Sequence, residues 1–197
     1  MQIVMTEKHA CIFTPYNPDF VERIKKIGNA KWKSNFWLIP VEAVDAAREI
    51  MRGVYGYDDT MENDTVNLRL TFLEEVSAEK SSVTCFAKVL AHAFSRDSGA
   101  RIGDDVAFIK GGGKSGGSAK NWRTIVEKGS IAMLYRVNRN IYNAWEDDPR
   151  IEVKLMKDNG VTPDTDDHKR QERLVRMITE AGTVSCAIFI CRGSPMT

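Results

Sequence analysis

The sequence feature that most constrains the fold is a glycine-rich basic stretch, IKGGGKSGGSAKNW, at residues 109–122. It holds five glycines and three lysines in fourteen residues. Each glycine disfavours a helix by about 1 kcal/mol relative to alanine, so a helix is excluded here. Two interpretations stay open. The stretch is either a flexible β-hairpin or interdomain loop, or a backbone cradle whose successive N–H groups bind an anion.

A Walker-type phosphate loop is excluded, although the stretch contains Gly-Lys-Ser at residues 113–115. That motif requires a glycine five positions before Gly113, where this chain has Phe108. It must also run directly into a helix, which Gly116 and Gly117 would break. A less specific site for phosphate remains compatible with the sequence.

The charge distribution favours an anionic partner for the same region. The whole chain of 197 residues has a formal net charge of +1, but residues 88–139 carry ten basic and four acidic side chains. An excess of positive charge in one segment is typical of a surface that attracts phosphate groups. The chain length predicts two small domains, or one domain with a sizeable appendage, and the hydrophobic content of 43% is ordinary for a globular protein.

Residues 1–58 are predicted to form a small strand-helix-hairpin-helix module. An apolar run at 9–14 predicts a strand. Asn17 and Pro18 are suited to begin a helix that ends before Gly28. Two short strands at 30–33 and 36–39 are expected to pair as a hairpin, followed by a second helix over 41–55.

The segment FTPYNPDFVERIKKIGNAKWKSNFWLIP, at 13–40, resembles the small HARP domain found beside the motor of annealing helicases and in shorter bacterial and phage proteins. The shared features are an aromatic strand, a Tyr/Asn-Pro turn, an Ile-Lys helix and a basic hairpin that ends in Trp-x-x-Pro. The resemblance covers only residues 1–58 and implies binding of single-stranded or structured DNA. No helicase motor accompanies it, so ATP-driven annealing is not implied.

The same residues point to DNA on chemical grounds, because basic side chains alternate with aromatic rings that stack on bases. The alternative is that Trp37 lies in the core and the lysines form a solvated helix face. The predicted nucleic-acid-binding residues are Arg23, Lys25, Lys26, Lys31, Trp32, Lys33 and Trp37.

The rest of the chain is predicted to contain a boundary strand and linker at 59–80 and a mixed α/β domain at 81–197. Apolar residues at helical spacing predict a helix over 82–94. Further strands are expected at 66–73, 106–109, 130–137, 150–156 and 183–191, a helical turn at 138–145 and a helix at 164–182. The predicted fold class is therefore α+β or α/β.

A second phosphate-facing or ligand-binding surface is predicted around the glycine-rich stretch, where serine hydroxyls, asparagine, tryptophan and cations gather. Its residues are Arg96, Ser98, Arg101, Lys110, Gly112, Gly113, Lys114, Ser115, Ser118, Lys120, Asn121, Trp122 and Arg123.

The sequence offers no set of residues typical of catalysis or metal binding. His9, His92 and His168 are scattered, so no Ser/His/Asp order can be argued. The acidic residues beside His168 are ordinary for the first turn of a helix. The four cysteines (Cys11, Cys85, Cys186, Cys191) are expected to be reduced thiols. No metal or cofactor is predicted, and enzymatic activity is left undecided, with a non-enzyme favoured.

These observations predict a cytoplasmic, non-catalytic DNA-binding accessory protein without a membrane segment, whose partner is single-stranded or forked DNA. The resemblance implies a phage or mobile-element origin. Two alternatives stay open: an inhibitor that binds a protein of a bacterial defence complex, and a nucleotide-binding protein or small enzyme that uses residues 111–118 as its phosphate site.

Overall fold

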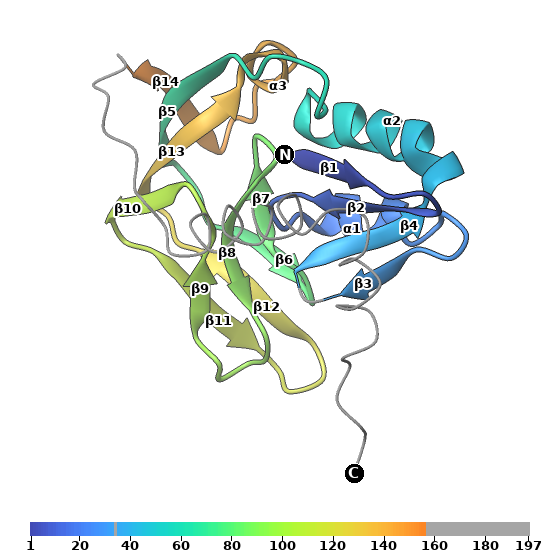
Figure 1. The fold of residues 1–197 in the computed structure, drawn as a ribbon. Helices are drawn as coiled ribbons and strands as arrows, with labels where there is room; N and C mark the ends of the chain where they lie inside the picture. The colour runs from blue at the N-terminus through green and yellow to red at the C-terminus, as the bar shows by residue number, and fades with distance from the viewer. Residues whose placement is uncertain (34, 157–197) are drawn as a thin grey trace.

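The computed structural model describes residues 1–33 and 35–156 of the chain. Four antiparallel sheets dominate it, accompanied by three α-helices and one short 3-10 helix (Figure 1). The predicted α+β or α/β class is therefore wrong, and the fold is β-rich. The predicted helix at 164–182 and strand at 183–191 lie outside the described residues.

The first 58 residues form a four-stranded sheet with two helices packed on it. The strand order is β1 (Gln2–Met5), β2 (His9–Phe13), β4 (Phe36–Pro40) and β3 (Lys31–Lys33). The helices are α1 (Pro18–Ile24) and α2 (Val44–Tyr55), the latter preceded by the 3-10 turn Val41–Ala43. Strand β1 was not predicted; the other elements of this part lie close to their predicted positions.

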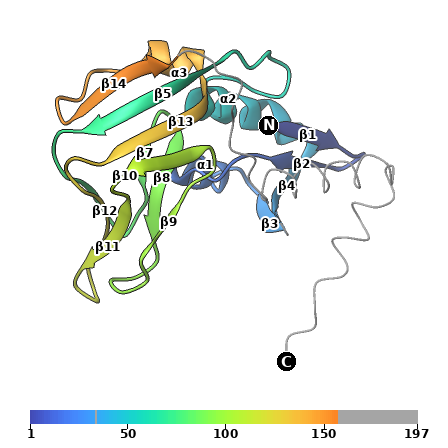
Figure 2. The ribbon, with the colours of Figure 1, turned by 90° about the vertical axis from the view of Figure 1, so that its left-hand side faces the viewer.

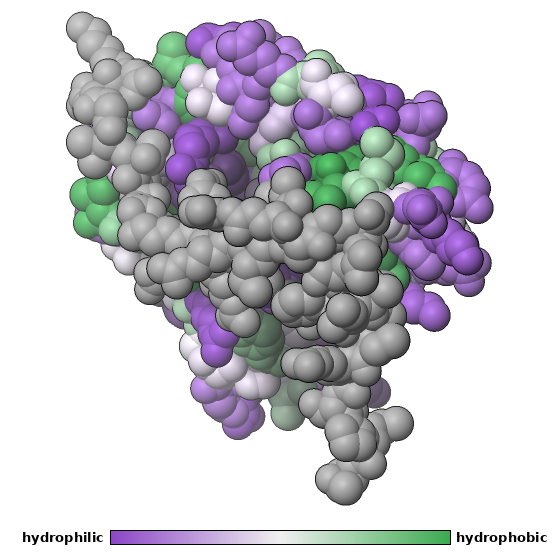
Figure 3. Space-filling view, viewed as in Figure 1, coloured by the Kyte–Doolittle hydropathy of each residue, from purple (hydrophilic) through white to green (hydrophobic). Residues whose placement is uncertain are grey.

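Alternation along β2 and β4 divides this part into two apolar layers. Ala10, Ile12 and Ile39 face the helices and pack in one cluster with Phe20 and Met51. On the opposite face of the sheet, a smaller cluster comprises Cys11, Phe13, Phe36 and Leu38. In Figure 3, hydrophilic side chains gather over α2, and a hydrophobic patch lies beside the edge strand β1.

Three antiparallel sheets form the remaining described part (Figure 2). The longest has the order β10 (Val106–Lys110), β13 (Ile131–Asn138), β5 (Thr65–Phe72) and β14 (Ile151–Met156). A second comprises β11 (Gly113–Gly117), β12 (Trp122–Val126) and β6 (Val76–Glu79). The third comprises β7 (Val83–Cys85), β8 (Lys88–Ala93) and β9 (Ala100–Ile102). The short helix α3 (Arg139–Asn143) follows β13.

The predicted helix over 82–94 is wrong, because this segment forms the hairpin of β7 and β8. Strand β8 contacts β11 and β12 as well as β10 and β13. Its residues Val89, Leu90 and Ala91 are consequently all buried. A strand buried on both faces has a continuous apolar run instead of strict alternation, and such a run is also compatible with helical spacing. The ambiguity is resolved by tertiary packing.

The turn between β7 and β8 joins the two parts of the molecule. Phe86 and Ala87 both adopt left-handed backbone angles, with φ of 51° and 60°. Phe86 packs in the core of the second part, where its ring centroid lies 4.3 Å from that of Trp145. Ala87 instead packs against the core of residues 1–58. Two adjacent residues therefore anchor the hairpin in two different cores.

Asn17 reinforces this joint with its buried side chain. Its Oδ1 accepts hydrogen bonds from the N–H groups of Asp19 (2.8 Å) and Phe20 (3.2 Å), which caps α1. Its Nδ2 donates to the Ala87 carbonyl at 3.2 Å. One amide thus stabilises a helix start and links it to the β7–β8 turn.

Two substitutions of Asn17 separate these roles. We expect Asn17→Ser to keep the cap, lose the bond to Ala87 and lower the free energy of unfolding by about 1 kcal/mol. Asn17→Ala loses both interactions and should cost about 1 kcal/mol more. Denaturant unfolding measures both values. Equal stability of the two variants would contradict the capping role.

Candidate nucleic-acid interface

Two adjoining hollows lie at the joint between the two parts and share Pro15 and Tyr16 in their walls. The first, named here the Trp32 hollow, has a volume of about 400 Å³. It belongs entirely to residues 1–58 and is lined by Thr14, Pro15, Tyr16, Phe20, Val21, Lys25, Trp32 and Trp37.

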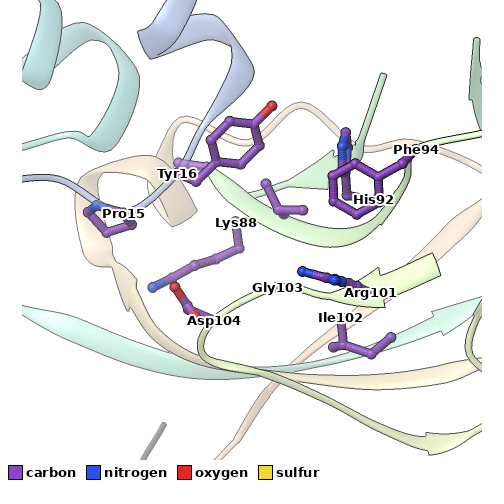
Figure 4. A pocket seen from close by; sticks show the side chains of 11 residues that line it. Pro15, Tyr16, Lys88, His92, Phe94, Arg101, Ile102, Gly103 and Asp104 are labelled. Atoms are coloured by element: carbon purple, nitrogen blue, oxygen red, sulfur yellow. The ribbon is translucent and has the colours of Figure 1, made fainter. Parts of the chain in front are cut away.

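The second, the His92 hollow, has a volume of about 320 Å³ and lies between Tyr16 and the β8–β9 hairpin. Its polar and aromatic lining comprises Tyr16, Lys88, His92, Phe94, Arg101 and Asp104. Figure 4 shows the Tyr16 ring on one side and the His92 and Phe94 rings on the other, with Lys88 and Arg101 extending into the space below them.

The strand register and two ring contacts bring three of these side chains together. His92 and Arg101 are cross-strand partners in β8 and β9. Phe94 directly follows β8, and its ring meets His92 edge to face with 4.4 Å between ring centroids. The Arg101 guanidinium carbon lies 5.2 Å from the centre of the Phe94 ring, within the range of a cation–π interaction.

The hollows expose aromatic rings to solvent. Tyr16 is 53% exposed, Trp32 54% and Phe94 56%. Trp37 is only 5% exposed and meets Trp32 edge to face, with 5.4 Å between ring centroids. Trp37 is thus a core residue that supports Trp32. Trp32 is the exposed ring of the predicted pair.

Ion pairs divide the predicted cations into two groups. Lys26 pairs with Glu22, Arg96 with Asp97, and Lys114 with Glu127. The other predicted cations form no ion pair with any residue in 1–33 or 35–156: Arg23, Lys25, Lys31, Lys33, Arg101, Lys110, Lys120 and Arg123. Lys25 and Arg101 belong to this second group and line the two hollows.

The predicted residues fall into several places on the surface. Arg23, Lys25 and Lys26 lie on or just after α1, and Lys31, Trp32 and Lys33 form β3. Around the glycine-rich stretch, Lys110 and Gly112 lie where β10 leads into β11. Ser118, Lys120 and Asn121 lie between β11 and β12, which Trp122 and Arg123 begin. Of this second predicted set, Arg101 lines a hollow, and Trp122 meets His92 edge to face with 6.3 Å between ring centroids.

Sequence reasoning missed Tyr16, His92 and Phe94. Tyr16 carried a signal, because it stands between two prolines in a turn, where an aromatic ring is readily exposed. For His92 and Phe94 the spacing of apolar residues predicts a helix, which gives no indication of their contact with each other or with Arg101.

A buried ionic network holds the β7–β8 hairpin beneath the His92 hollow. Lys88 Nζ donates to Asp105 Oδ2 at 2.7 Å, and Arg136 donates to Asp105 Oδ1. Burial acts to raise the pKa of the Asp105 carboxyl, but Lys88 and Arg136 together outweigh burial and hold that pKa below its usual value. Asp105 is therefore ionised at neutral pH and neutralises Lys88.

Substituting Asp105→Asn tests this network, because asparagine also tolerates the left-handed backbone of this position, φ 60°. The variant leaves two cations without their carboxylate and should lower the free energy of unfolding by about 2–3 kcal/mol at pH 7. A lowered pKa stabilises the fold above the unfolded-state pKa of about 4, and that stabilisation is lost as the pH falls further. The difference between wild type and variant should hence shrink below about pH 4. A difference that is constant from pH 7 to pH 3 would contradict the role of Asp105.

His92 makes one side-chain hydrogen bond among the described residues: its Nδ1 lies 2.8 Å from Ser82 Oγ. Burial lowers the pKa of the His92 imidazole, so the ring is neutral at neutral pH. No carboxylate orients the ring within 1–33 and 35–156. The pair fixes the orientation of the ring in the wall of the hollow and lacks the third member of a catalytic triad.

The glycine-rich segment is a strand with specific packing. Residues 113–117 form β11, paired with β12 along their whole length. A Cβ on Gly113 would lie 2.3 Å from the Ala91 Cβ, and one on Gly116 would lie 2.8 Å from Ile125 Cδ1. Ser115 Oγ donates to the Arg96 carbonyl at 2.7 Å and accepts from the Gly99 N–H at 3.1 Å. Close approach of β11 to β8 accounts for Gly113; phosphate binding by the segment remains a prediction.

Gly112 and Gly113 form a matched pair for testing this packing. Gly113→Ala should lower the free energy of unfolding by about 1–3 kcal/mol, because its Cβ meets Ala91. The Cβ added by Gly112→Ala meets no atom within 4 Å, so this variant should change the free energy of unfolding by less than about 0.5 kcal/mol. Thermal and denaturant unfolding provide both values, and equal effects would refute the packing role of Gly113.

Comparisons with known proteins return nothing for this chain: no family model, no curated protein and no solved structure matches it. Within the described residues, no helix has the length and apolar character needed to cross a membrane. The same residues contain no cluster of three or more His, Cys, Asp or Glu suited to hold a metal ion.

Proposed function

We propose that this protein binds single-stranded DNA, including the single-stranded arm of a fork, and catalyses no reaction in doing so. The observation that carries the proposal is the Trp32 hollow. There, two half-exposed rings, Trp32 and Tyr16, flank a space that Lys25 also lines. A solvent-exposed tryptophan in a concave site, beside a lysine that forms no ion pair with the described residues, suits an unpaired base and its phosphate.

The supporting chemistry is stacking combined with charge. An unpaired base presents a π-face that stacks on an indole ring, which contributes about 1–3 kcal/mol per base. Lys31 and Lys33 flank Trp32 on β3 and form no ion pair with the described residues. Their ammonium groups are therefore available to phosphates on either side of the stacked base. The resemblance of residues 13–40 to the HARP domain supports the same ligand.

Base stacking in the hollow favours single strands over duplexes. In a duplex, each base is already stacked and paired, so entry into the hollow requires unstacking at a cost of a few kcal/mol. A single strand or the open arm of a fork avoids that cost. Affinity should therefore follow the availability of unpaired bases.

Fluorescence anisotropy with labelled single-stranded, forked and duplex DNA tests the proposal. Trp32→Ala should weaken single-strand binding about tenfold, while Trp32→Phe, which keeps a ring, should retain most of it. Lys25→Ala should reduce the slope of log affinity against log salt by about 0.7, corresponding to one phosphate contact. Lys128→Ala is the charge-matched control, since Lys128 is exposed and lies outside both hollows.

The outcome that contradicts the proposal is absence of DNA binding by the wild type at low salt, or equal affinity of wild type and Trp32→Ala. Thermal unfolding of each variant verifies that the fold is intact. Trp37→Ala is unsuitable for this purpose, because Trp37 is buried and its loss would destabilise the core.

A further inference from the structure

We infer that the His92 hollow is a second base-binding site, which takes the neighbouring unpaired base of the same strand that occupies the Trp32 hollow. The inference rests on the proposed function and extends it from one base site to a two-site path across both parts of the protein. None of the predicted sets of residues contained Tyr16, His92 or Phe94, which define this path.

Continuity between the two hollows is the first argument. Pro15 and Tyr16 line both, so the two hollows adjoin across one shared wall. The Tyr16 ring stands between the Trp32 hollow and the His92 hollow. Its centroid lies 6.0 Å from the centroid of the His92 ring. A DNA strand that leaves one hollow would have to pass only Tyr16 to reach the other. Tyr16 would stack on a base from either side.

The second argument is that both hollows repeat one arrangement: a half-exposed ring beside a cation that has no ion pair within the described part of the chain. Trp32 and Lys25 line the first, and Phe94 and Arg101 line the second. Arg101 forms no ion pair with the residues the structure describes, and its guanidinium lies over Phe94. An arginine beside an aromatic ring offers both a phosphate contact and a planar surface for a base.

Charge favours nucleic acid as the occupant. Lys88 in the wall of this hollow pairs with Asp105 and Asp104 also lines the hollow, while Arg101 forms no ion pair with the residues that the structure describes. The hollow also lies in the segment 88–139, where basic side chains exceed acidic ones by ten to four. Its volume of about 320 Å³ falls at the lower end of the range for small-ligand sites, which suits a single base and not a folded surface.

The test is the length dependence of binding, measured by fluorescence anisotropy with oligodeoxythymidylates of increasing length from the dinucleotide upward. In the wild type, affinity should rise as the strand becomes long enough to enter both hollows. Phe94→Ala should weaken binding of the longer strands about tenfold and leave the shortest ones unchanged. Trp32→Ala should weaken binding at every length.

Matched variants separate stacking from other effects. Phe94→Leu keeps apolar bulk and removes the aromatic face, so it should behave as Phe94→Ala if bases stack there. Arg101→Ala should weaken long strands and lower the salt slope by about 0.7, while Arg101→Lys should restore the slope alone. Ile109→Ala removes an exposed apolar side chain outside both hollows and should leave every affinity unchanged.

Three results would overturn the inference in distinguishable ways. If Phe94→Ala and Arg101→Ala bind all lengths as the wild type does, while Trp32→Ala does not, the second site is refuted and the proposed function stands. Wild-type affinity for the longer strands retained by Phe94→Leu would refute base stacking on Phe94. If the wild type binds no DNA, both proposals fall.

Discussion

The two-residue turn at Phe86 and Ala87 is the constraint on which the arrangement of the molecule depends. A β-hairpin with two left-handed residues normally uses asparagine and glycine, which tolerate that backbone. Here a phenylalanine and an alanine adopt it, with φ of 51° and 60°. The conformational cost, about 1–2 kcal/mol for each residue, is offset because each side chain is anchored in a different core.

The same turn creates the candidate interface. Asn17 is bonded to the Ala87 carbonyl, and its neighbour in sequence is Tyr16. On the other side of that bond, Lys88 to Ala93 leave the turn as β8 and carry His92. Tyr16 on one wall of the His92 hollow and β8 on the other therefore both directly adjoin the residues of one hydrogen bond, Asn17 and Ala87.

Local signals in the sequence predicted only part of the secondary structure: β1, β6 and β9 were not predicted, and the β7–β8 hairpin was predicted as a helix. Asn17 followed by Pro18 is a strong helix start, and α1 begins at Pro18 as expected. Strands at 106–109, 130–137 and 150–156 were also placed nearly correctly, because their flanking turns and alternation are local properties. The strand β8 was mistaken for a helix because burial on both faces depends on β11 and β13, which are distant in sequence.

The candidate site shows the same contrast between residues that a local pattern reveals and residues that only tertiary packing brings together. Lys25, Lys31 and Trp32 were recognisable from their composition, since alternating cations and aromatic rings form a local pattern. Phe94 and Tyr16 are separated by most of the first half of the chain, and no local pattern relates them. Their proximity follows from the Asn17–Ala87 bond, which a single sequence does not reveal.

The glycine-rich segment contributes to the interface through the opposite face of the β8–β9 hairpin. Gly113 lies against Ala91 and Ala100, so a Cβ on Gly113 would meet both of their side chains. In the strand register, the adjacent residues His92 and Arg101 are paired and project away from that contact. Close packing of β11 behind the hairpin thus holds His92 and Arg101 toward the hollow. The segment that its composition predicts to contact a ligand thus also has a structural role, because it packs behind the residues that line the site.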